Sequence, residues 1–121
     1  MTKVLVVEDE TVLADAYKIV LEKAGYDVYV AYRGQQGLEL AAMHKPNVIL
    51  LDMLMPEMNG IDFLKELKPK QLPHTKVCVL SNIENPEIMK AATKLGAVDY
   101  LLKVNYTPYQ IADIVDKLIK K

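Results

Sequence analysis

Residues 48–60 read VILLDMLMPEMNG, and this stretch decides the fold. Its first four residues, Val48 to Leu51, form an unbroken aliphatic run, which is typical of a strand buried on both faces of a parallel sheet. The run ends at Asp52, although an ionised aspartate is rarely buried without a partner. A proline, a polar turn and the pair Asn59-Gly60 follow, and they indicate a helix start. The sequence therefore predicts a buried strand with the acid Asp52 at its carboxyl end.

Four further segments have the composition of strands, and each is separated from the next by a helical pattern. The five predicted strands are Val4–Val7, Val28–Ala31, Val48–Leu51, Lys76–Leu80 and Tyr100–Leu102. The second run is short and follows Asp27, which indicates an edge strand.

Helices are predicted after each strand from apolar residues at i, i+3 and i+4 and from cap signals. They cover Leu13–Ala24, Gln35–His44, the segment from Asn59-Gly60 to Pro69, the segment from Asn85-Pro86-Glu87 to Gly96, and the segment from Thr107-Pro108 onward. This alternation predicts an α/β fold of five βα units, doubly wound, with a five-stranded parallel sheet and helices on both faces. The flavodoxin-like strand order 2-1-3-4-5 fits, although the pattern alone does not fix it.

The length of 121 residues favours one domain over residues 1–121, and we expect no output domain within it. The net charge is −1, and the lysines at positions 117, 120 and 121 are interpreted as a helix end that complements the helix dipole. We therefore expect no direct binding of nucleic acid. The single cysteine, Cys78, lies in an apolar run and is interpreted as a small buried residue. Without a membrane-length apolar stretch or a signal-peptide pattern, the expected location is cytoplasmic, with no membrane association.

Polar residues follow the strands at the edge where ligands of open α/β sheets bind. They are Glu8 and Asp9, Asp52, Ser81, and Lys103. Three acids this close are costly unless a cation binds, and carboxylate oxygens suit Mg²⁺. A lysine and a hydroxyl suit phosphoryl oxygens, and an aspartate can attack phosphorus to form an aspartyl-phosphate. The set therefore predicts phosphoryl transfer to Asp52.

Each of these residues also has a simpler interpretation. Asp52 could be a turn residue, and Asp9 could cap the first helix. Ser81 could be an ordinary loop hydroxyl, and Lys103 a solvated lysine. The coincidence of all of them at one edge argues against these interpretations.

Four motifs together resemble the receiver domain of two-component response regulators. They are VLVVEDE at 4–10, LLDMLMPEMNG at 50–60, VLSN at 79–82 and DYLLK at 99–103, and the resemblance covers essentially the whole chain. It implies that Asp52 is the phosphoacceptor. It also implies that Asp9, Asp52 and the backbone carbonyl of Leu54 bind Mg²⁺ directly, with Mn²⁺ as an alternative, while Glu8 acts through metal-bound water.

The resemblance further implies that Ser81 and Lys103 hold the phosphoryl oxygens and that Tyr100 is a switch aromatic. The alternative for Tyr100 is a surface aromatic on an edge strand. The implied partners are a histidine kinase or phosphotransfer protein and a downstream protein or a missing output domain. They would read the face made by the fourth helix, fifth strand and fifth helix, which could also form a dimer. Such a chain is no separate enzyme, because it only assists its own phosphorylation and slow autodephosphorylation.

The sequence departs from the family pattern at three places. Val104 replaces the proline that usually follows the lysine with a cis peptide bond. A cis bond costs about 2.5–4 kcal/mol before a non-proline residue, against roughly 0.5–1 before proline, so we expect a trans bond with Lys103 placed differently. Asn82 replaces a small residue, and it would crowd the phosphoryl pocket, donate a hydrogen bond to it, or face solvent. Leu54 and Ile83 flank the pocket and are expected to hinder the water that hydrolyses the phosphoryl group.

Other proteins with this fold fit less well. A haloacid-dehalogenase-like phosphatase needs a second aspartate at the position of Leu54, and a flavodoxin needs a phosphate loop where Glu8-Asp9-Glu10 would repel phosphate. A dinucleotide-binding domain needs a GxGxxG motif there. The stronger alternative is a pseudo-receiver that keeps the fold and binds partners without phosphorylation, which the residues around Ser81 and Lys103 leave open.

Overall fold

The computed structural model describes residues 2–120 and contains five strands and five α-helices in strict alternation. Two short 3₁₀ turns, η1 and η2, interrupt the connections. In chain order the elements are β1 (Lys3–Val7), α1 (Thr11–Lys23), β2 (Asp27–Ala31), α2 (Gly34–His44), β3 (Val48–Asp52), α3 (Gly60–Leu67), η1 (Pro69–Gln71), β4 (Lys76–Ser81), α4 (Pro86–Lys94), β5 (Ala97–Leu102), η2 (Lys103–Asn105) and α5 (Pro108–Lys120).

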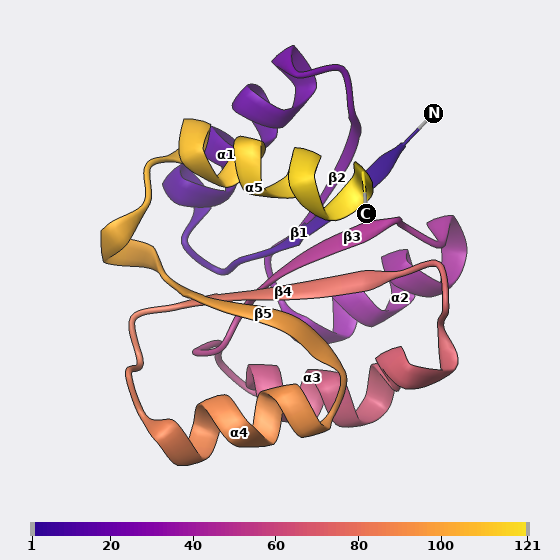
Figure 1. Cartoon of the computed structure of the whole chain (residues 1–121). Coiled ribbons are helices and arrows are strands. Elements are labelled where there is room, and N and C mark those ends of the chain that lie inside the picture. Colours follow the sequence, from indigo (N-terminus) through magenta and orange to yellow (C-terminus); the bar gives the residue numbers. More distant parts are fainter. Residues whose placement is uncertain (1, 121) are drawn as a thin grey trace.

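All five strands pair in parallel in the order β2-β1-β3-β4-β5, which confirms the predicted topology (Figure 1). β2 lies at one edge, as its short apolar run indicated, and β5 lies at the other. The central strand β3 is buried at every position from Val48 to Asp52. Because the strands run in the same direction, their carboxyl ends share one edge of the sheet.

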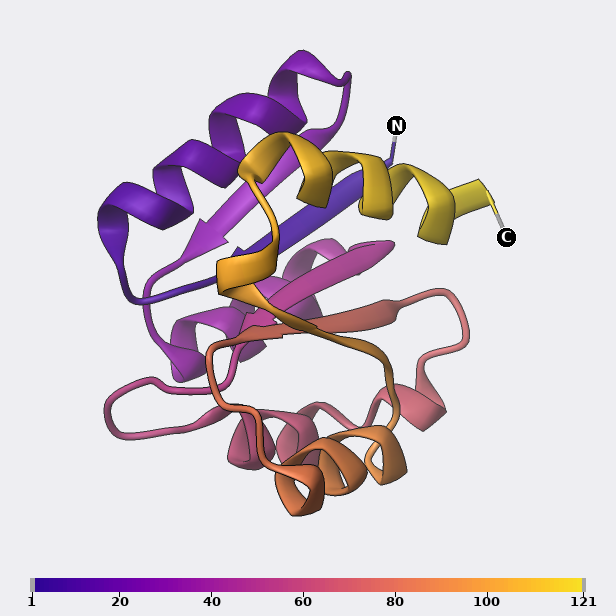
Figure 2. The ribbon, with the colours of Figure 1, turned by 60° about the vertical axis from the view of Figure 1, so that its left-hand side comes forward.

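Helices cover both faces of the sheet and create two hydrophobic cores (Figures 1 and 2). On one face α1 and α5 pack against alternate strand residues such as Val6, Leu50 and Cys78. On the other face α2, α3 and α4 enclose Val7, Leu51 and their neighbours. The split follows from the pleat, since successive side chains of a strand point to opposite faces. Every apolar residue of the central strands β1, β3 and β4 therefore belongs to one of the two cores, which explains the continuous apolar runs.

Local signals account for most element boundaries. The side chains of Asn59 and Asn85 accept hydrogen bonds from the first backbone N–H groups of α3 and α4, as expected of N-cap residues. Gly25 and Gly96 end α1 and α4 with φ values of 97° and 111°, a conformation that favours glycine. The predicted start of β5 at Tyr100 was wrong, because the strand begins at Ala97. Since β5 is an edge strand, it tolerates exposed residues there and shows no continuous apolar run.

Three expectations from composition concern Cys78, the lysines near the end of the chain and membrane-spanning helices. The thiol of Cys78 is fully buried, and burial raises its pKa to about 12, as expected of a packed, unreactive cysteine. Lys117 and Lys120 lie in the last turn of α5, whereas Lys121 lies outside the described residues. Within residues 2–120, no helix combines the length and the apolar character that crossing a membrane requires.

We expect Gly37→Val to destabilise the fold, because a Cβ at Gly37 would lie 2.9 Å from both Phe63 Cε2 and Val7 Cγ2. Such overpacking typically costs about 1–3 kcal/mol. The matched control is Gln35→Val, which places the same side chain on the exposed face of the same helix. Urea unfolding should show the loss for Gly37→Val alone, and equal stabilities would contradict the tight packing of α2 on β1.

Candidate functional site

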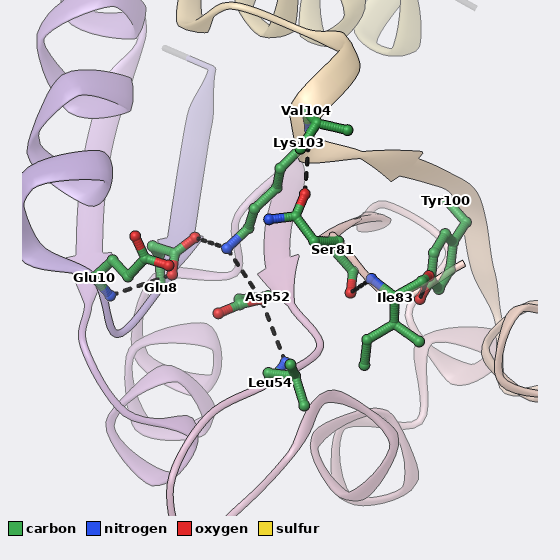
Figure 3. A network of polar contacts seen from close by, with 10 residues as sticks. Glu8, Glu10, Asp52, Leu54, Ser81, Ile83, Tyr100, Lys103 and Val104 are labelled. Atoms are coloured by element: carbon green, nitrogen blue, oxygen red, sulfur yellow. Dashed lines mark hydrogen bonds and ion pairs between the residues drawn. The ribbon is translucent and has the colours of Figure 1, made fainter. Parts of the chain in front are cut away.

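The carboxyl edge of the sheet brings together residues that are far apart in the sequence. Glu8 follows β1, Asp52 is the last residue of β3, Ser81 is the last residue of β4, and Lys103 follows β5. The register places Asp52 beside Leu80, the neighbour of Ser81. The predicted convergence of the strand ends is therefore what the structure shows (Figure 3).

Lys103 lies between two acids from different strands. Its Nζ is 2.7 Å from Glu8 Oε1 and 3.2 Å from Asp52 Oδ1, and its side chain is only 9% exposed (Figure 3). Burial lowers the pKa of Lys103, but its contacts with Glu8 and Asp52 outweigh that effect and leave the pKa raised. Lys103 is therefore a buried cation at neutral pH, and the interpretation of it as a solvated lysine was wrong.

Backbone N–H groups complete the environment of the two acids. Glu8 Oε2 accepts a hydrogen bond from the Glu10 N–H at 3.2 Å, and Asp52 Oδ1 accepts one from the Leu54 N–H at 3.3 Å. The residue at the N-cap position of α1 is Glu10, so Asp9 does not cap that helix. Because Asp9 does not cap the helix, its half-buried carboxylate can act together with those of Glu8 and Asp52.

The acids carry more negative charge than Lys103 can balance. The pKa of Asp52 is raised from 3.8 to about 8, because burial and the neighbouring Glu8 together outweigh the opposite effect of Lys103. In the protein without a bound cation, the ionised form of Asp52 is therefore disfavoured. A divalent cation would restore that form, which is the form that can attack phosphorus.

The donor set fits a hard cation such as Mg²⁺. Glu8, Asp9 and Asp52 each offer a carboxylate oxygen, and these three oxygens lie within 4.8 Å of one another. Mg²⁺ prefers oxygen ligands and usually binds through one or two carboxylates while it keeps several waters. Two of the acids are buried and one is half-buried, so the cluster is held by the fold and still opens to solvent.

The β4–α4 loop is fixed by hydrogen bonds on both sides. Ser81 Oγ accepts one from the Ile83 N–H at 3.0 Å, which leaves the hydroxyl hydrogen free to donate elsewhere. The hydroxyl of the half-buried Tyr100 donates to the carbonyl of Ile83 at 2.9 Å (Figure 3). Tyr100 therefore packs inward against this loop, and its interpretation as a surface aromatic was wrong.

Asn82 and Val104, the residues beside Ser81 and Lys103 that depart from the family pattern, contact each other in the structure. The Lys103–Val104 peptide bond is trans, as expected. With this trans bond, η2 turns the chain so that the Lys103 side chain reaches Glu8 and Asp52. The expectation that Lys103 is placed differently from its counterpart in relatives with proline stays a prediction. Asn82 is exposed, as its solvent-facing alternative predicted, and its Oδ1 also accepts a hydrogen bond from the Val104 N–H at 3.2 Å. Sequence reasoning missed this contact, and its signal was the non-proline residue after the lysine. Crowding of the phosphoryl pocket and donation of a hydrogen bond to it stay predictions.

The pocket-flanking residues differ from each other in environment. Leu54 is 61% exposed, whereas Ile83 is half-buried against the core beneath α2, α3 and α4. The backbone of Leu54 is tied to Asp52, so its exposed side chain stands at the entrance to the site. The effect of this apolar pair on water stays a prediction, as do the chemical roles of the other site residues.

Comparison with known proteins agrees with the geometry. The model of the response regulator receiver domain matches residues 4–118. The chain belongs to the response regulator receiver family. The chemotaxis protein CheY of Thermotoga maritima is 35% identical over 98% of this chain and 95% of its own. The receiver domain is therefore a component of two-component signalling, a system controlled by phosphorylation.

Solved structures of receiver domains share the fold. A CheY-like receiver domain protein from Methanospirillum hungatei superimposes with a TM-score of 0.91 at 25% identity, over 99% of this chain and 94% of that one.

The transcriptional regulatory protein CrdR of Helicobacter pylori is 35% identical over 84% of this chain but only 47% of its own length. The chain thus spans about half the length of some curated relatives, CrdR and the response regulator ArlR of Staphylococcus saprophyticus, and nearly all of CheY.

We expect Asp52→Asn to stabilise the metal-free receiver domain, increasingly as the pH rises from about 4 to about 8. The folded state raises the pKa of Asp52 from 3.8 to about 8, so it holds the proton more tightly than the unfolded chain does. The stability of the parent protein therefore falls across this window, whereas asparagine has no proton to lose.

Urea unfolding with a chelator at a series of pH values measures this difference. Saturating Mg²⁺ should reduce it, because the cation favours the ionised carboxylate of the parent protein. A difference that stays constant between the two pH limits would contradict the raised pKa of Asp52.

Proposed function

We propose that the domain accepts a phosphoryl group on Asp52 and thereby switches a binding surface. The observation that carries this proposal is the position of the Lys103 ammonium, between Glu8 and Asp52 at the carboxyl edge of the sheet. A buried cation beside a buried nucleophile provides the charge that a phosphoryl group needs. The phosphoryl donor is a histidine kinase, a phosphotransfer protein or a small phosphodonor.

In the proposed reaction an oxygen of the Asp52 carboxylate forms a bond to phosphorus as the bond from phosphorus to the donor breaks, and the leaving group keeps the bonding electrons. Lys103 neutralises charge on a phosphoryl oxygen, and the Ser81 hydroxyl donates a hydrogen bond to another. Glu8, Asp9, Asp52 and the Leu54 carbonyl would hold Mg²⁺, with Mn²⁺ as an alternative. When bound, this ion would neutralise charge on the phosphoryl oxygens. The chain thus assists its own modification and slow dephosphorylation and is not a separate enzyme.

The proposed switch starts from the new charge. A phosphoryl group brings roughly −1.5 to −2 charges and several strong acceptors. Ser81 and Lys103 gain a partner, and Ser81 is joined through Ile83 to the hydroxyl of Tyr100. A shift in the β4–α4 loop therefore reaches β5 directly. The face made by α4, β5 and α5 changes shape for a downstream protein, an output domain or a second copy of the chain.

The proposed setting is the cytoplasm, where histidine kinases present their phosphorylated domains. In the proposed role the domain binds proteins and neither nucleic acid nor membranes. Its net charge of −1 supports this part of the proposal.

Intact mass after incubation with a small phosphodonor tests the proposal. We expect one phosphoryl adduct on the wild type with Mg²⁺, none without a divalent cation, and none on Asp52→Asn. The matched control is Asp62→Asn, which makes the same change at an exposed acid in the first turn of α3 and should leave the adduct unchanged. Absence of any adduct on the wild type would instead favour a pseudo-receiver that binds its partners without phosphorylation.

The apolar pair at the pocket should make the phosphorylated state long-lived. We expect the double variant Leu54→Asn, Ile83→Glu to lose its phosphoryl group faster, because polar side chains there can position the attacking water. Decay of the adduct followed by mass after removal of the donor measures this rate. An unchanged half-life would show that the two side chains do not limit the access of water.

A further inference from the structure

The hydrogen bond between Asn82 and Val104 joins the two loops that carry the proposed phosphoryl-binding residues. Asn82 directly follows Ser81, and Val104 directly follows Lys103. The Val104 N–H donates to Asn82 Oδ1 at 3.2 Å across 22 residues of chain. A proline at position 104 would have no N–H to donate. The two departures from the family pattern are therefore the two halves of one contact.

This contact continues the sheet beyond its last backbone pair. The ladder between β4 and β5 ends with Ser81 opposite Leu102. Beyond that pair the strands separate, so backbone pairing no longer fixes the distance between the two loops. The side chain of Asn82 supplies the next cross-connection, one residue beyond Ser81 on one chain segment and two residues beyond Leu102 on the other.

The exposure of the two residues shows that the contact is not a by-product of core packing. The Val104 side chain is 77% exposed, and Asn82 is also exposed. An exposed hydrogen bond adds little to global stability. Its effect is local, because it restrains the backbone on which Ser81 and Lys103 are mounted.

We propose that Asn82 and Val104 form a latch that positions Ser81 and Lys103 for phosphoryl transfer to Asp52. The latch restrains the backbone directly after Lys103, as a proline at position 104 would. In this role both residues act through Ser81 and Lys103, so both are positioning residues. This inference rests on the proposed function of Asp52 as phosphoacceptor.

Four variants separate the latch from other effects. Asn82→Leu keeps the approximate size of the side chain but removes the acceptor, and Asn82→Ala removes both. Val104→Pro removes the donor, whereas Val104→Ala keeps the N–H and shortens a side chain that is mostly exposed. The matched control is thus Val104→Ala, which should behave as the wild type does.

We expect phosphorylation by acetyl phosphate, followed by intact mass, to slow about 3- to 10-fold in Asn82→Leu, Asn82→Ala and Val104→Pro. The Mg²⁺ concentration at half-maximal rate should stay unchanged, because the latch does not contact the acidic cluster. The double variant Asn82→Leu, Val104→Pro should be no slower than the slower single variant, since both changes break the same bond. Hydrogen exchange at the amide of residue 104 should accelerate in Asn82→Leu but not in Val104→Ala.

Different outcomes contradict different claims. Faster phosphorylation of Asn82→Ala than of the wild type would mean that Asn82 crowds the pocket, and it would overturn the latch. Rates equal to the wild type in Asn82→Leu, with the wild type phosphorylated, would overturn the positioning role alone. A wild type that takes up no phosphoryl group under any condition would overturn the proposed function and the positioning role together. Because Asn82→Leu leaves the backbone N–H groups intact, it tests the latch even if Val104→Pro does not fold.

Discussion

A single buried ammonium group holds the carboxyl edge of this sheet together. Lys103, delivered by the turn after β5, contacts Glu8 beyond β1 and Asp52 at the end of β3. Breaking a buried ion pair typically costs about 3–5 kcal/mol, and removal of Lys103 would leave both buried acids without a compensating charge. This contact spans most of the width of the sheet. It depends on the order of the strands, on the turn at η2 and on the burial of both acids.

The same contact supports the proposed reactivity of the site, because the charges around it are unbalanced. Three carboxylates face one ammonium, so the cluster carries excess negative charge whenever all the acids are ionised. A structural ion pair would be closer to balance. The excess favours a bound cation, and that cation together with Lys103 would then provide positive charge for an incoming phosphoryl group. The acids cannot easily move apart to relieve this excess charge, since β3, which carries Asp52, is buried along its whole length.

The sequence predicts the fold and the site because both depend on short-range patterns. The apolar runs identify the strands, and the acid after one run, Asp52, predicts the chemistry. The sequence fails where a contact joins distant segments. The bond from Tyr100 to the Ile83 carbonyl has no local signal. The bond from Val104 to Asn82 is signalled only by two separate departures from the family pattern, which do not indicate that the two residues are partners. The start of β5 at Ala97 was missed for a related reason, since an edge strand with exposed Val98 lacks the apolar run of a central strand.

The pairing of α1 with α5 has a consequence for the order in which the protein can assemble during synthesis on the ribosome. The face covered by α2, α3 and α4 is complete once β5 has emerged. The opposite face needs Ile111, Ala112 and Val115 from α5, so α1 and its strand partners stay partly uncovered until residues 108–120 have been made. Such exposed apolar surface is a target for chaperones and for aggregation. A nascent chain of this kind is therefore most vulnerable in the interval between translation of β5 and completion of α5.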